Sequence, residues 1–220
     1  MRAFVATVIV FCGGFAVMVL EIIGARLLGK DFGSSLYVWT SQIGVVMIAL
    51  AIGYCLGGWL ADRQGRLRGL ACLVLPAAVS TFFIPEYAGV LIGWIVMRHP
   101  VDQPIPPIWE KLDPALGSAA LFLVPCIGLG AICPFMIRIC ARDIMKVGRI
   151  SGWLIAASTM GSIAGVFVSG YLLIDLFSLP TIFRGVGILS LFLSLLCIMF
   201  DPVMGSIWHS KAKADGYENR

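Results

Sequence analysis

The chain has 220 residues, of which 60% are hydrophobic and only 13% are charged, and its formal net charge is +4. A soluble domain carries about 25% charged residues, so this composition excludes a water-soluble protein and predicts an integral membrane protein. The Lys and Arg residues are spread over the ends of apolar runs and form no basic stripe interleaved with aromatic residues, which excludes a nucleic-acid-binding protein.

Six apolar runs are long enough to predict membrane spans, because a helix needs about 20 apolar residues to cross a bilayer. A seventh run, 86–97, is too short to cross alone and follows Pro85, so we expect either a bent extension of the third helix or a helix on the outer membrane surface. The connection 98–114 contains five prolines and is expected to be an extended strut. The predicted spans cover about 3–28, 36–61, 69–84, 115–138, 150–175 and 181–200. The predicted fold is an all-α bundle of six transmembrane helices, followed by a tail over 201–220.

The distribution of basic residues predicts the orientation of this bundle. If both termini are cytoplasmic, eleven of the 16 Lys and Arg residues lie on the inner side and five on the outer side. Such an excess on one side marks the cytoplasmic face. We therefore expect a multi-pass protein whose N and C termini are both cytoplasmic.

Cysteine and histidine residues indicate neither a disulfide framework nor a metal site. The seven cysteines lie within or at the ends of apolar runs, and the two histidines are far apart in the sequence. Cys126, Cys133 and Cys140 recur every seven residues and are interpreted as small residues at a helix-packing seam; a thiol relay is the alternative. No metal and no cofactor is expected.

The end of the second span carries the most informative motif of the chain, GWLADRQGRLR over 58–68. It resembles the loop between helices 2 and 3 of the major facilitator superfamily, whose pattern is G-x-L-A-D-R-x-G-R-[RK]. This resemblance implies that the aspartate helps to latch neighbouring helices on the inner side of the membrane. The alternative is a set of charges that only fixes topology. The candidate latch residues are Gly58, Asp62, Arg63, Gly65, Arg66 and Arg149.

Further motifs resemble the membrane region of bacterial fused major-facilitator/spermidine-synthase proteins. These are a glutamate in the first span followed five residues later by Arg26, the G-x-G-A-x-x-P pattern over 128–134, and a glycine-rich motif of the fifth span that begins at Gly148. The resemblance covers roughly residues 8–178. Ser158 replaces an asparagine that is usual in the family, and Asp175 stands where proline is frequent. The chain ends about 20 residues after the sixth span, and it contains no loop typical of the catalytic aminopropyltransferase domain.

The resemblance implies a location in the bacterial inner membrane and a transporter-like half of a twelve-helix protein that handles a polyamine or another small organic cation. Six helices rarely enclose a substrate path alone, so we expect a homodimer or a partner membrane subunit. The alternative is a membrane-anchoring or sensing subunit for a separate cytoplasmic enzyme similar to spermidine synthase, that is, an aminopropyltransferase. No catalytic residues are expected within the chain.

Candidate binding residues are the polar and ionisable groups inside the spans: Glu21, Arg26, Gln42, Ser158 and Asp175. Ionisable groups at such depth face a cavity or a partner. Glu21 is either a cation- or proton-binding carboxylate or half of a buried ion pair that fixes the first hairpin. Gln42 is expected to form a hydrogen bond to Glu21, and Asp175 either shares the cavity of Glu21 or is solvated at the interface.

Overall fold

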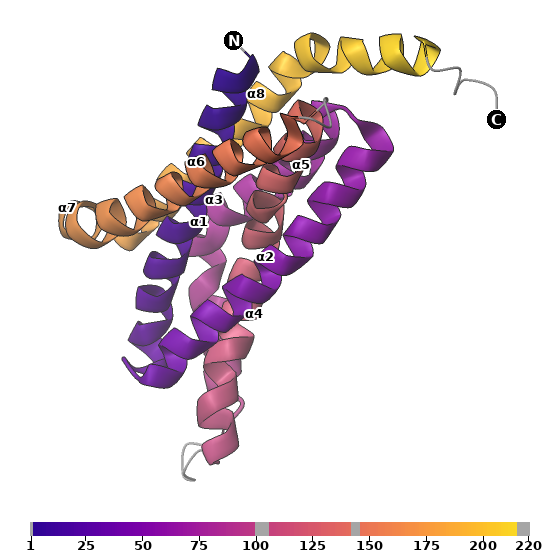
Figure 1. Cartoon of the computed structure of the whole chain (residues 1–220). Coiled ribbons are helices and arrows are strands. Elements are labelled where there is room, and N and C mark those ends of the chain that lie inside the picture. The colour runs from indigo at the N-terminus through magenta and orange to yellow at the C-terminus, as the bar shows by residue number, and fades with distance from the viewer. Residues whose placement is uncertain (1, 100–105, 142–145, 215–220) are drawn as a thin grey trace.

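The computed structural model describes residues 2–99, 106–141 and 146–214, and the described residues contain helices and turns but no strand. Within these residues, six segments are long and apolar enough to cross a membrane (Figure 1). They are Ala3–Phe32, Leu36–Gln64, Leu67–Met97, Pro107–Cys140, Val147–Leu176 and Leu179–Pro202. The chain is therefore an all-α protein with six candidate membrane spans, in agreement with the prediction from composition.

The first three spans are continuous helices joined by very short turns. Helix α1 covers Arg2–Phe32, α2 covers Leu36–Gln64 and α3 covers Leu67–Met97. Gly65 follows α2 with φ 57° and its N–H donates to the Ala61 carbonyl at 3.0 Å, a left-handed cap that favours glycine. Because α3 runs through Pro85, the segment 86–97 continues the third helix and is not a separate surface helix. Neighbouring helices can compensate for the hydrogen bond that a proline removes within a membrane.

The fourth span consists of two helices, α4 (Pro107–Gly130) and α5 (Ile132–Cys140). They are separated at Ala131, where Pro134 lacks the N–H that would bond to the carbonyl of Gly130. The expected extended strut over 98–114 is wrong for its second half, because α4 already begins at Pro107. Proline is favoured in the first helical turn, where no partner for its nitrogen is needed. Residues 100–105 of this connection lie outside the described residues.

The fifth span combines α6 (Val147–Val168), a π-helical turn η2 (Ser169–Leu173) and the short α7 (Ile174–Leu176). The last helix, α8, covers Leu179–Ala214 and so continues beyond the sixth span. The segment 201–220, expected as a tail, is therefore helical as far as Ala214. This end of α8 turns away from the bundle after Pro202 (Figure 1).

Glycines set the closest helix contacts, as their four-residue spacing predicts for membrane helices. A Cβ at Gly57 would lie 2.8 Å from the Cα of Ala131, so α2 packs directly on the break between α4 and α5. A Cβ at Gly161 would lie 3.0 Å from the Cα of Phe11, so α6 packs as closely on α1. Substitution of these glycines by larger residues would therefore force the helices apart.

Burial is uneven among the six spans. In the fourth span 61% of the most apolar window is buried, whereas the values are 28% for the second span and 22% for the fifth. Bulky apolar side chains on α2 and α6, such as Trp59 and Trp153, are more than half exposed. The second and fifth spans therefore present broad apolar faces to lipid or to another membrane protein.

Candidate functional site

Glu21 lies on α1, four residues beyond the middle of the helix, or about 6 Å along its axis. Its side chain is partly buried, and among the described residues no Lys, Arg or His forms an ion pair with it. The buried Cys126 of α4 is within electrostatic range of this carboxylate. The described residues thus show no ion pair that would fix the first hairpin, and they give Glu21 no counter-charge within its candidate membrane span.

Gln42 is fully buried where α1, α2 and α4 meet. Its Oε1 accepts a hydrogen bond from the Ser118 hydroxyl at 2.6 Å, and its Nε2 has no hydrogen-bond partner among the described residues. The expected hydrogen bond from Gln42 to Glu21 is therefore wrong. Gly24 makes room for this amide: a Cβ at that position would collide with Gln42 Nε2 and lie 2.7 Å from Cζ of Phe122.

Arg26 and Asp175 lie near a different hollow, at the end of the bundle away from the N-terminus. Arg26 lines a recess of about 240 Å³ together with Trp39 and Ile174. Both Arg26 and Asp175 are exposed, and neither forms an ion pair with another described side chain. Asp175 follows Ile174 directly, so the two charged groups share one end of the bundle but not the surroundings of Glu21.

Ser158 lies in a third place, on α6. It lines a cavity of about 150 Å³ between α1, α2, α5 and α6, together with Tyr54, Cys133 and Ser162. The Ser162 hydroxyl donates to the Gly14 carbonyl at 3.3 Å, so the polar wall of this cavity is partly satisfied by α1. The five candidate binding residues are thus distributed over three separate places in the bundle.

The aspartate of the candidate latch has a partner that the sequence analysis did not name. Asp62, at the end of α2, forms an ion pair with Arg138 of α5. Both side chains are more than half exposed, at 64% and 56%. The pair joins the ends of the second and fourth spans across the face of the bundle, where water can compete for both charges.

The other candidate latch residues have distinct surroundings. Arg63 lies over the Trp59 ring, with Cζ 5.2 Å from the ring centre, and Gly65 caps α2. A Cβ at Gly58 would meet nothing within 4 Å, so no close contact requires glycine there. Arg66 is exposed at the start of α3. Arg149 lines a recess between α1, α5 and α6 instead of facing Asp62.

Two buried aspartates that the sequence analysis overlooked join neighbouring spans. Asp113 of α4 accepts from Arg98 and lies 2.7 Å from His99 Nε2, at the end of α3. Asp201 of α8 lies 3.0 Å from Arg68 Nε at the start of α3. Opposite charges at the same end of predicted spans are the signal that could have found these pairs.

Comparison of the chain with family models, with curated proteins and with solved structures finds no match. Within the described part of the chain, no group of three or more His, Cys, Asp or Glu side chains is placed to hold a metal ion. The charged residues within the spans, through their positions and partners, are therefore the features that bear on function.

Proposed function

We propose that this multi-pass membrane protein is a transporter-like half-bundle that binds a small organic cation such as a polyamine. The observation that carries the proposal is Glu21, a carboxylate at membrane depth without a basic partner among the described residues. Charges at this depth cost about 3 kcal/mol or more unless a cavity or a partner compensates them. A bound cation supplies that compensation.

The amide of Gln42, near Glu21, also supports cation binding. Gln42 is buried and its Nε2 lacks a hydrogen-bond partner among the described residues. Gln42 Nε2 lies against Gly24, one helical turn from Glu21 on α1. The fold thus places a carboxylate and an amide near one another where α1, α2 and α4 meet. An ammonium group can donate to the Glu21 carboxylate and to the second lone pair of Gln42 Oε1, which already accepts from Ser118, whereas Gln42 Nε2 is itself a donor.

The exposed ion pair between Asp62 and Arg138 supports a conformational change at this end of the bundle. Exposed ion pairs contribute about 0–1 kcal/mol, so this contact can form and break at little cost. The two residues connect the ends of the second and fourth spans, as expected of a latch. In this proposal, the latch closes the end of the bundle that carries the N-terminus, and the motif over 58–68 serves the same role as in the major facilitator proteins that it resembles.

The proposal requires a second membrane unit to complete the substrate path. The second and fifth spans bury only 28% and 22% of their most apolar windows within one chain. A homodimer or a partner membrane subunit would cover these faces and complete a path between the two halves. This arrangement corresponds to two six-helix units in a bacterial inner membrane, each with both termini in the cytoplasm.

Uptake of radiolabelled spermidine into proteoliposomes that contain the purified chain tests this function. We expect saturable uptake by the wild-type protein and its loss in Glu21→Gln, which removes the charge with almost no change of shape. Glu110→Gln is the matched control, because Glu110 is an exposed carboxylate in the first turn of α4. Equal uptake by wild type and Glu21→Gln, at equal amounts of folded protein, would contradict the proposal.

A second function has one specific observation in its favour. The end of α8 continues past Pro202 to Ala214 and turns away from the bundle (Figure 1), where it can contact a soluble protein. This geometry suits an anchoring or sensing subunit for a separate aminopropyltransferase-like enzyme. Co-purification with an enzyme encoded by a neighbouring gene, lost when the chain is truncated after Pro202, would favour this function over transport.

A further inference from the structure

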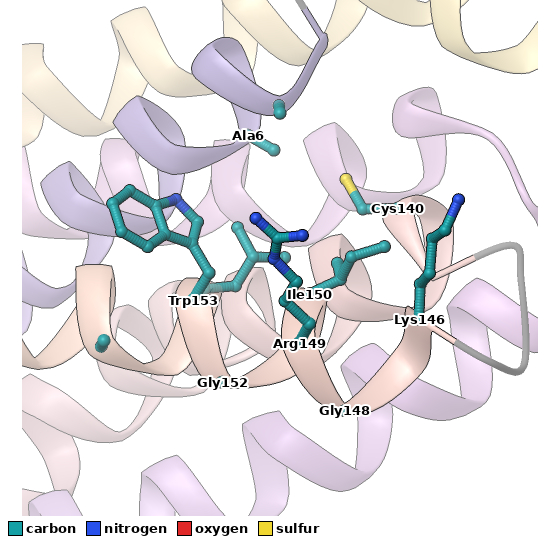
Figure 2. A pocket seen from close by; sticks show the side chains of 11 residues that line it. Ala6, Cys140, Lys146, Gly148, Arg149, Ile150, Gly152 and Trp153 are labelled. Carbon is teal, nitrogen blue, oxygen red and sulfur yellow. The ribbon is translucent and has the colours of Figure 1, made fainter.

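The recess that Arg149 lines lies at the end of the bundle that carries the N-terminus. We call it the basic recess. It has a volume of about 690 Å³ and is bounded by the first turns of α1 and α6 and by the end of α5. Residues that define it include Ala6, Cys140, Lys146, Arg149, Ile150 and Trp153 (Figure 2). None of the places discussed for Glu21, Gln42 or Ser158 overlaps with it.

The charged side chains among the described residues of the recess lining are all basic. Arg149 projects from the start of α6 toward the hollow in Figure 2, with Lys146 at its edge beside Cys140, and the described residues of the lining include no acidic side chain. The ion pairs formed between described residues use Arg68, Arg98, Arg138 and Arg184, so Arg149 keeps its charge for a ligand. An anion is therefore the complementary group.

The remainder of the lining is apolar. Ala6, Ile150 and Leu154 form the walls beside the two cations. Trp153 closes one side, and its Nε1 donates to the Thr7 hydroxyl at 3.0 Å, which fixes the indole between α6 and α1. Tryptophan and basic residues at the end of a membrane span mark the boundary between lipid and water. The recess thus offers cations next to apolar walls at that boundary.

We propose that the basic recess binds an anionic glycerophospholipid, with the phosphate group at Arg149 and an acyl chain along the apolar wall. Basic pockets between transmembrane helices bind anionic head groups in this way. A small soluble anion would pair with Arg149 but would not contact the apolar walls. A zwitterionic lipid would bind more weakly, because its head group has no net charge to pair with the basic lining. The inference does not depend on the proposed transport, because the described lining of the recess contains neither Glu21 nor Gln42.

Native mass spectrometry of the detergent-purified protein tests this site. We expect phosphatidylglycerol to remain bound as a discrete adduct at concentrations where phosphatidylcholine does not. Arg149→Gln should weaken phosphatidylglycerol binding about fivefold, the effect of one cation near an anionic head group. Arg149→Lys should retain binding, because it keeps the charge. Arg63→Gln is the matched control at the same end of the bundle, since Arg63 lies over Trp59 and outside the recess lining.

Three results would overturn the inference. Equal binding of the two lipids by the wild-type protein would show that charge does not select the ligand, and this measurement needs no variant. Equal loss of binding in Arg63→Gln and Arg149→Gln would show a general effect of surface charge. Displacement of phosphatidylglycerol by millimolar inorganic phosphate, with an effect of Arg149→Gln on phosphate binding, would show a site for a soluble anion in place of a lipid.

Discussion

The contact between α1 and α6 gives the sharpest test of the packing, through the substitution Gly161→Ala. An added Cβ would lie 2.8 Å from the carbonyl carbon and 3.0 Å from the Cα of Phe11, and it would also collide with the carbonyl oxygen. Ordinary contact requires 3.4 Å or more, so the two helices must move apart by more than half an ångström. Such overpacking costs about 1–3 kcal/mol. For a chain of this length, that corresponds to a loss of about 2–12 °C in Tm.

The matched control is Gly152→Ala in the same helix. A Cβ at Gly152 would meet nothing within 4 Å, so the substitution adds no clash and removes the entropic penalty of a helical glycine, about 0.5–1 kcal/mol. Thermal unfolding of the purified protein in detergent, followed by circular dichroism, measures both variants. We expect Gly161→Ala to melt below the wild type and Gly152→Ala to melt at or above it. Equal stability of the two variants would refute the close approach of α6 to Phe11.

Two further predictions concern a buried ion pair and the topology. Arg68→Gln should lower Tm more than Asp201→Asn, because it removes the charged partner of a carboxylate that is 8% exposed and leaves it only the backbone N–H of residue 68, at a cost of about 1–3 kcal/mol. The 65% exposed Arg68 left by the second substitution is solvated. Equal losses of Tm for the two variants would contradict this asymmetry. Reporter fusions in the connection between the third and fourth spans and at the C-terminus should lie on opposite faces of the membrane, and reporters on the same face would refute the six-span topology with cytoplasmic termini.

Hydropathy predicted much of the fold. The second span was expected over 36–61 and is helical over Leu36–Gln64, and the left-handed Gly65 follows where a turn was expected. The start of α4 was missed because prolines lower the expectation of helix, although Pro107 stands at a first helical turn, where proline is favoured. Local sequence signals of this kind depend on the composition within a window of the chain. They therefore predict where a helix lies more accurately than they predict its first and last residues.

Partners of the polar residues could not be predicted in the same way. Gln42 was assigned to Glu21 and instead bonds to Ser118 of the fourth span. The candidate latch grouped Asp62 with Arg63, Arg66 and Arg149, but the partner of Asp62 is Arg138. The partner of each of these side chains depends on which helices are neighbours and on how each helix is rotated about its axis. The sequence alone gives the depth of a residue in its span but not this rotation.

The acidic residues of the spans divide into two groups by the presence of a partner. Asp113 and Asp201 are buried and paired, which is how a folded membrane protein compensates a charge that serves structure. Glu21 lies deeper along its helix and has no such partner among the described residues. A carboxylate that only stabilised the bundle would be expected to follow the first pattern. Because Glu21 departs from this pattern, cation binding by its carboxylate accounts for its position better than packing does.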